Sequence, residues 1–315
     1  MAPVNTIIFG PTGAVGSAAA RTAQQHGAKV ILAMRDTQKS IPQLTPAQEK
    51  SGGFERIQAD LTKLDTITAA VTKSGAKHAF LYLDFHSSDG MRSVIETLKS
   101  AGIKLVVFLS SGGVMRRDLE SIPPSEFISY SHARVEINLR EVFGPQGYIA
   151  VRPFYFSSNT KQWVSMIKAG EVKLLHPEVV FDFISPEDIG VVCGIFAAGG
   201  LKAADGKNEI ELCGPEQMSQ GDAVGVIAKV LGKDIKVTEV GEEEALQVFI
   251  TESKFPEMMA KQLVYIINSG VGDGVGARLY VGEEYQEATG NILKYGGKKP
   301  EGFEEWVAQN KHEFV

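Results

Sequence analysis

The chain has 315 residues, of which 43% are hydrophobic and 22% charged, and this composition is typical of a globular protein with a substantial core. A net charge of −6 argues against a general nucleic-acid-binding protein, which would carry a basic face. Two cysteines predict neither a disulfide framework nor a metal site. The sequence shows neither a signal-peptide pattern nor an apolar run of roughly 20 residues. We therefore expect a cytoplasmic protein without metal, membrane or nucleic-acid partners.

The first half of the chain alternates short apolar runs with segments of helical spacing. The expected strands are residues 4–9, 29–34, 54–59, 79–83, 104–109 and 148–151, and the expected helices are residues 14–26, 64–72, 89–101 and 126–143. Strands that alternate with helices form right-handed crossovers and give a parallel sheet. We therefore predict an α/β fold with a Rossmann doubly wound parallel sheet.

The pattern becomes less regular after residue 153. Here we expect helices at residues 159–169, from 186, at 220–231 and at 242–250, with extended chain at 172–183 and 210–213. These segments contain no second phosphate loop, so they predict a smaller α/β C-terminal substrate domain. The expected domains are residues 1–153 and 154–315, interlocked so that the Rossmann sheet could take a strand from the second.

A glycine-rich loop, Gly10-Pro-Thr-Gly13-Ala-Val-Gly16, follows the first expected strand and opens the first expected helix. Gly10 permits a tight turn, Gly13 lets the backbone approach a pyrophosphate, and Gly16 allows close packing of helix and strand. The amides and the positive end of the helix then attract phosphate. The loop predicts cofactor contacts from Gly10, Thr12, Gly13, Ala14, Val15 and Gly16, and a purely structural turn is the alternative.

The end of the second expected strand indicates which dinucleotide binds. NAD-binding proteins usually carry an acidic residue about 20 positions beyond the loop, where it bonds a ribose hydroxyl. Arg35 holds this place, and its planar guanidinium suits the 2′-phosphate of NADP. The neighbouring Asp36 could instead contact a hydroxyl, and Arg35 could be no more than an exposed strand-end residue. We predict NADP as the cofactor.

The third and fourth expected strands end in residues that should border the same cofactor. Asp60 and Leu61 follow the third strand, where Asp60 could accept the adenine amine or cap the next helix. Leu83 and Asp84 follow the fourth strand and should lie beside the middle of the cofactor.

The expected helix 126–143 holds the candidate proton donor. Tyr130 and Arg134 have the spacing of the tyrosine and lysine of short-chain dehydrogenases, with arginine in place of lysine. The apolar stripe of the helix (residues 128, 135, 139 and 142) includes His132, so His132 points inward and the other two point away. We therefore expect His132 to donate a proton or to contact the nicotinamide ribose, with a pKa near the working range and Glu136 as a possible orienting group. A buried, structural histidine is the alternative.

At these residues the chain resembles the NmrA-like branch of the atypical short-chain dehydrogenases, over nearly its whole length. The residues that carry the resemblance are 10–16, 34–36, 59–61, 132–136, 152–156 with Asn159, 186–190 and 231–233. The resemblance implies NADP binding at the first loop and at Arg35, with Tyr155, Ser158 and Asn159 near the nicotinamide. Family members often carry lysine at the position of His132, so the histidine departs from a lysine-based mechanism. The family also includes NADP-sensing regulators with little catalysis.

Two functions are consistent with these observations. The first is an NADPH-dependent reductase of a quinone, an enone or an aromatic polyketide-like small molecule, in which His132, Tyr155 or a water supplies the proton. Aromatic residues 154–156 and Trp163 could line a flat pocket for such a substrate. The second is a redox-sensing protein that binds NADP(H) and docks on a protein partner, which the missing tyrosine–lysine pair favours. We favour the reductase.

Overall fold

A computed structural model describes residues 3–272 and 274–315. It divides into two compact units. The first unit comprises Met1–Pro153, Pro186–Leu212 and Asn291–Lys298, and the second comprises Phe154–Ser185, Cys213–Gly290 and Lys299–Val315. Each unit is thus assembled from three separate stretches of sequence. Within the described residues, no helix is long and apolar enough to cross a membrane.

The first unit is built on a seven-stranded parallel sheet with the order β3-β2-β1-β4-β5-β6-β9. The strands are β1 (Asn5–Phe9), β2 (Lys29–Met34), β3 (Glu55–Gln58), β4 (His78–Tyr82), β5 (Leu105–Leu109), β6 (Tyr148–Pro153) and β9 (Glu209–Leu212). The first six follow the order of the dinucleotide-binding Rossmann fold, which confirms the predicted fold class. β9 pairs with β6 in parallel and forms one edge of the sheet.

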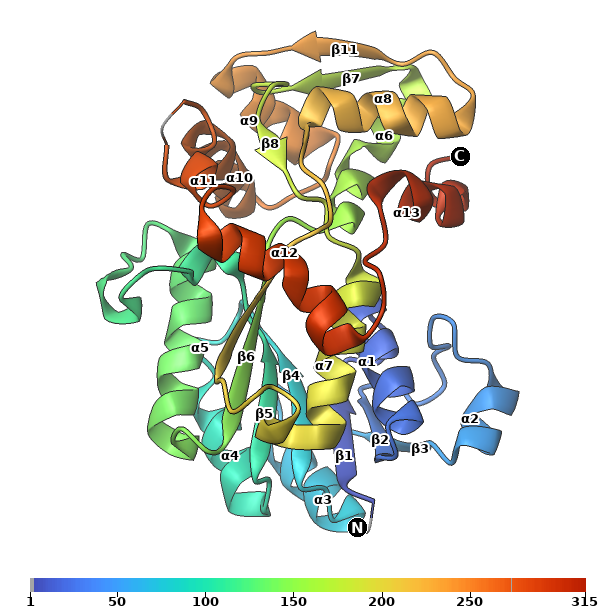
Figure 1. Cartoon of the computed structure of the whole chain (residues 1–315), viewed down its shortest axis with the longest axis vertical. Helices are drawn as coiled ribbons and strands as arrows, with labels where there is room; N and C mark the ends of the chain where they lie inside the picture. Colours follow the sequence, from blue (N-terminus) through green and yellow to red (C-terminus); the bar gives the residue numbers. More distant parts are fainter. Residues whose placement is uncertain (1–2, 273) are drawn as a thin grey trace. The chain divides into compact units, whose positions relative to one another are not determined.

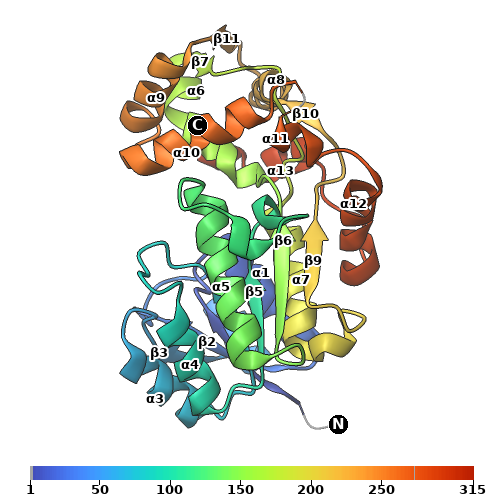
Figure 2. The same ribbon diagram turned by 90° about the vertical axis from the view of Figure 1, so that its left-hand side faces the viewer.

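Helices cover both faces of this sheet. They are α1 (Ala14–Gln25), α2 (Pro46–Gly52), α3 (Leu64–Ser74), α4 (Arg92–Ala101), α5 (Phe127–Phe143) and α7 (Pro186–Gly199). Figures 1 and 2 show α3, α4 and α5 on one face and α1 and α7 on the other. Alternate strand residues face opposite sides, so Ile7 and Phe9 of β1 join the core beneath the first layer and Ile8 faces the second.

The α1 and α7 helices approach unusually closely. A Cβ atom added to Gly190 of α7 would lie 2.3 Å from the Ala18 Cβ atom, and one added to Gly194 would lie 2.6 Å from the Ala19 carbonyl oxygen. The facing residues of α1 are mostly alanines, all fully buried. The contact therefore depends on small side chains on both helices, because any larger one would push the two backbones apart.

The second unit has two small sheets and its own core. β7 (Glu171–Leu174) pairs in parallel with β11 (Lys236–Glu239), and β8 (Val180–Phe181) pairs antiparallel with β10 (Met218–Ser219). Its helices are α6 (Val164–Ala169), α8 (Gln220–Leu231), α9 (Glu242–Thr251), α10 (Glu257–Ser269), α11 (Val275–Arg278), α13 (Phe303–Gln309) and, up to Gly290, α12 (Glu283–Gly296). Short 3₁₀ helices lie at Gly112–Val114, Leu119–Ser121, Ser157–Trp163, Gly200–Lys202 and Lys311–Glu313.

Several elements differ from those predicted. The expected helix 159–169 is a 3₁₀ helix followed by α6, and the expected extended segment 172–183 is two short strands. A break separates these strands at His176, whose φ of +47° a continuous strand cannot contain. The helices α2, α10, α11, α12 and α13 and the strand β11 were not predicted.

The glycine contact between α1 and α7 predicts a specific loss of stability. Gly190→Ala adds a methyl group where no space exists, so we expect the free energy of unfolding to fall by roughly 1–3 kcal/mol in denaturant titration. Gly225→Ala on α8 is the control, because nothing lies within 4 Å of its added methyl. That change should stabilise the protein by about 0.5–1 kcal/mol. An unaltered unfolding midpoint for Gly190→Ala would contradict the close contact.

Candidate functional site

A cavity of about 490 Å³ opens at the carboxyl ends of β1, β2, β3 and β4 in the first unit. Seven of the predicted cofactor-binding residues line it, namely Gly10, Thr12, Arg35, Asp60, Leu61, Leu83 and Asp84. Gly13, Ala14, Val15 and Gly16 belong to the same loop and to the first turn of α1. Ligands bind at this end of the strands in open α/β sheets, where the chain reverses its direction of winding. The cavity therefore has the place expected of a dinucleotide site.

The glycines of the loop are required by its geometry. Gly10 has a φ of +69°, and a Cβ atom there would lie 2.6 Å from the ring of Tyr82. A Cβ atom on Gly16 would lie 2.3 Å from the Gly10 carbonyl oxygen. Gly13 is the N-cap of α1, where no side chain caps the helix and no acidic residue occupies the first turn. The positive end of α1 thus remains available to an anion such as a pyrophosphate.

Two cations line one side of the cavity. Arg35 and Lys39 are exposed, and in the part of the chain that the structure describes neither has a carboxylate partner. The sequence analysis missed Lys39, although a basic residue in the loop after the second strand was an available signal. The Asp36 carboxylate accepts a hydrogen bond from the Gln38 amide at 2.9 Å, so it forms a turn. This side of the cavity therefore attracts a doubly charged anion.

Asp60 and Asp84 line the opposite part of the cavity and also shape its loops. The Asp60 Oδ1 atom accepts hydrogen bonds from the amide and the hydroxyl of Thr62, and these bonds lower the pKa of Asp60. Asp60 caps this turn, whereas the helix α3 begins later, at Leu64. The Asp84 Oδ1 atom accepts the His86 amide at 3.0 Å. Both carboxylates are thus ordered at the rim before any ligand binds.

His132 lies on the inner face of α5, as predicted. Its side chain is packed beside Phe85 and Phe108, with ring centroids 5.8 and 6.1 Å away. The Nδ1 atom lies 2.8 Å from the Ile128 carbonyl oxygen, which can only accept, so Nδ1 carries the proton and Nε2 is an acceptor. Burial lowers the pKa of His132 to about 4. The expectation of a pKa near the working range was wrong, because the spacing of the helix did not reveal how thoroughly the ring is desolvated.

Glu136 does not orient His132, which corrects a second expectation. Its carboxylate instead forms a buried bidentate pair with Arg152, with Nη2–Oε2 at 2.5 Å and Nε–Oε1 at 3.0 Å. The Ser110 hydroxyl donates to the same carboxylate at 2.5 Å. Arg134, on the other side of α5, is exposed as predicted. A catalytic tyrosine–arginine pair that resembles the dehydrogenase motif therefore has no support in the geometry of this helix.

Tyr155, Ser158 and Asn159 belong to the second unit, and their expected contacts with the nicotinamide stay predictions. The Tyr155 ring stacks on Phe181 at 4.1 Å, and its hydroxyl accepts a hydrogen bond from the Gln162 amide at 2.8 Å. Burial raises the pKa of Tyr155. Ser158 is half-buried and Asn159 is exposed.

Asp182 is a buried acid of the second unit that sequence analysis missed. It accepts the amides of Tyr155 and Gly214, both at 2.8 Å, while burial raises its pKa to about 6. No motif marks it, because its role depends on two backbone amides that lie far apart in sequence.

The comparison with known protein families identifies the chain. The model of the NmrA-like family matches residues 5–273, which is most of the sequence. The chain belongs to the NmrA-like family. This membership agrees with the sequence resemblance and with the strand order of the first unit.

Known relatives of this NmrA-like protein are of more than one kind. The nitrogen metabolite regulation-like protein bik4 of Gibberella fujikuroi is 36% identical, over 96% of this chain and 94% of that protein. The (4-alkanoyl-5-oxo-2,5-dihydrofuran-3-yl)methyl phosphate reductase of Streptomyces griseus is 24% identical, over 98% and 99% respectively. Among solved structures, the NADPH-dependent quinone oxidoreductase of Escherichia coli complexed with NADPH has a TM-score of 0.70 and 16% identity, over 97% of this chain and 99% of that one. The last likeness shows the fold.

The neutral His132 of this NmrA-like protein predicts a pH effect on stability. Its pKa is about 4 in the folded chain and ordinarily 6.5, so the folded state binds fewer protons between these values. Stability contributed by the neutral ring is therefore lost as the pH falls from 6.5 to 4, by roughly 3 kcal/mol. His132→Phe removes this loss, so its unfolding free energy should decline less steeply with acid.

Comparison of the two proteins isolates His132 from the other titrating groups. Asp182 has a raised pKa, so its contribution has the opposite sign in the same pH range, but it is present in both proteins and cancels. Parallel pH profiles for wild type and His132→Phe would contradict a buried, neutral histidine.

Proposed function

We propose that the first unit binds NADP(H) and that the chain is an NADPH-dependent reductase of a small organic molecule. The observation that carries the proposal is the pair of cations, Arg35 and Lys39, on one side of the cavity that begins at the phosphate loop, since no carboxylate of the described residues pairs with either. NAD has a hydroxyl where NADP has a 2′-phosphate, so these cations favour NADP. Reductase relatives that include an NADPH complex of the same fold support the choice.

The residues of the cavity fit the parts of NADPH. The pyrophosphate would lie at the uncapped end of α1, where Gly10 and Gly13 leave room for it. The adenosine would lie between Leu61 and Leu83, with the amine facing Asp60. Arg35 would hold the 2′-phosphate through its planar guanidinium. When bound, NADPH supplies a hydride.

Reduction of a quinone, an enone or an aromatic polyketide-like substrate requires one hydride and one proton. His132 has its only proton on Nδ1, directed at the Ile128 carbonyl, so at neutral pH it cannot donate from Nε2. Burial also makes Tyr155 a weaker acid. We therefore infer that water supplies the proton. His132 would instead accept a hydrogen bond at Nε2 from a ribose or substrate hydroxyl and so hold it in place.

A second candidate function is that of a regulator that senses NADP(H) and binds a protein partner. The likeness to a regulation-like protein at 36% identity favours it. So does the position of Arg134, which points into solvent and cannot assist a catalytic tyrosine. Both candidates use the same cavity for NADP(H), so they differ only in the event that binding triggers, which is hydride transfer in one and partner capture in the other.

Cofactor preference tests the common part of both functions. Arg35→Ala should weaken NADPH binding roughly 10- to 100-fold in calorimetric titration, because one charge-assisted contact is lost, and it should leave NADH binding nearly unchanged. Lys104→Ala is the matched control, since this exposed cation lies beside the opposite end of the strands. Equal affinity of the wild type for NADPH and NADH would contradict the proposed cofactor.

Turnover separates the reductase from the regulator. The reductase should oxidise NADPH in the presence of a panel of quinones and enones, measured as loss of nicotinamide absorbance. His132→Phe keeps a ring in the same place but removes the acceptor, so turnover should fall about tenfold while NADPH still binds. NADPH binding without turnover on any of these substrates would favour the regulator, and unchanged turnover in the variant would exclude a role for His132.

A further inference from the structure

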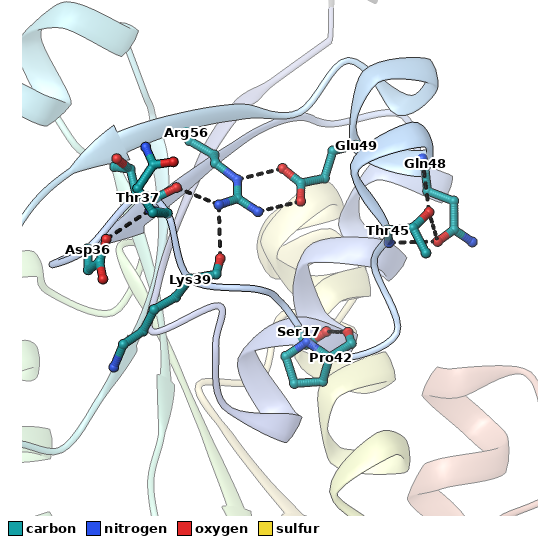
Figure 3. Close-up of polar contacts among 10 residues, drawn as sticks. Ser17, Asp36, Thr37, Lys39, Pro42, Thr45, Gln48, Glu49 and Arg56 are labelled. Atoms are coloured by element: carbon teal, nitrogen blue, oxygen red, sulfur yellow. Dashed lines mark hydrogen bonds and ion pairs between the residues drawn. The ribbon is translucent and has the colours of Figure 1, made fainter.

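The loop between β2 and α2 carries Lys39 past the cavity without regular secondary structure of its own. Side chains from elsewhere fasten it instead, as Figure 3 shows. The Ser17 hydroxyl of α1 donates to the Pro42 carbonyl oxygen. The Thr45 side chain and Gln48 form a reciprocal capping box at the start of α2. These contacts fix the far end of the loop, several residues beyond the cations.

Arg56 of β3 fastens the near end. Its Nη1 atom donates to the Thr37 carbonyl oxygen at 2.5 Å and to the Lys39 carbonyl oxygen at 2.9 Å. Its Nε and Nη2 atoms donate to the two carboxylate oxygens of Glu49 at 2.7 and 2.6 Å. The guanidinium therefore joins β3, the loop and α2, and the carboxylate of Glu49 fixes its plane.

The position of this ion pair bears directly on the cations of the cavity. Arg56 does not line the cavity, whereas Arg35 and Lys39 do, on either side of the held carbonyl of Thr37. Figure 3 shows the Lys39 side chain leaving the loop on the side away from Arg56 and Glu49. A lysine on a mobile loop loses entropy when it binds a ligand, and a loop held beforehand reduces that loss.

We propose that the Arg56–Glu49 pair is a positioning device that holds the Thr37–Lys39 backbone so that Lys39 meets the 2′-phosphate, and that it thereby sets the preference for NADPH over NADH. The inference rests on the proposed NADP(H) site. Lysine cannot replace Arg56, because one ammonium group cannot donate to two carbonyls and a bidentate carboxylate in a single plane. The pair acts through Lys39 and not by touching the cofactor.

A double-mutant cycle tests this coupling. Affinities for NADPH and NADH would be measured calorimetrically for wild type, Arg56→Lys, Lys39→Ala and the double variant. We expect Lys39→Ala to weaken NADPH binding about tenfold and Arg56→Lys about fivefold, with NADH nearly unchanged. In the Lys39→Ala background, Arg56→Lys should then have less than a twofold effect, because the residue that it positions is gone.

Controls separate this effect from a general loss of structure. Arg140→Lys changes another arginine paired with a glutamate, Glu120, outside the cavity, and should leave the NADPH-to-NADH ratio as in wild type. Thermal melts would verify folding, and Glu49→Gln would replace Arg56→Lys in the cycle if that variant does not fold. Glu49→Gln should weaken NADPH binding in the same direction and again only when Lys39 is present.

The outcomes distinguish the inference from the proposed function. A wild type without preference for NADPH overturns both. A wild type that prefers NADPH, together with additive effects of the two substitutions, overturns the positioning role alone. Equal losses of NADPH and NADH in Arg56→Lys also overturn it, because they would indicate a purely structural pair. Non-additive effects confined to NADPH support it.

Discussion

The contact between the α1 and α7 helices is the constraint on which the first unit depends. Because Gly190 and Gly194 have no side chains, α7 can lie directly against the alanines of α1 and hold that helix at a fixed height over the sheet. The N-terminus of α1 carries the phosphate loop, so its position determines where an anion can bind. On another side of α1, Ser17 holds the Pro42 carbonyl and thereby fixes the loop that carries Lys39. Close packing at one end of the unit thus sets the geometry of charge recognition at the other.

A buried ion pair has a similar organising effect on the opposite layer. Arg152 of β6 pairs with Glu136 of α5, and Glu209 and Glu211 of β9 approach the same guanidinium at 3.0 and 3.2 Å. Desolvation of these charges is costly, so the pair contributes little net stability compared with an apolar replacement. Its effect is geometric, because it joins α5 to two strands and sets the rotation of the helix. That rotation directs His132, one turn away, toward the interior.

The sequence allowed prediction of those features that depend on local pattern. β2 was predicted to the residue, because a strand buried on both faces is a continuous apolar run. The phosphate loop and Arg35 were predicted because their spacing is fixed by the strand and helix that they join. The pairing of β9 with β6 joins residues far apart in sequence, and no local signal reveals it. The ionisation of His132 and the bonds of Arg56 also escaped prediction, because desolvation and the path of a loop arise only in the folded chain.

The division of the first unit into three stretches of sequence governs how it can be assembled during translation. The edge of β6 has no neighbour until Glu209–Leu212 is made, and the alanine face of α1 stays bare until α7 emerges. The last stretch brings Lys298 to within 2.6 Å of the buried Asp188. At ordinary rates of elongation, roughly ten seconds or more separate the synthesis of β6 from that of Lys298. For this period the nascent chain presents an open sheet edge and an apolar helix face, which are the surfaces that chaperones bind.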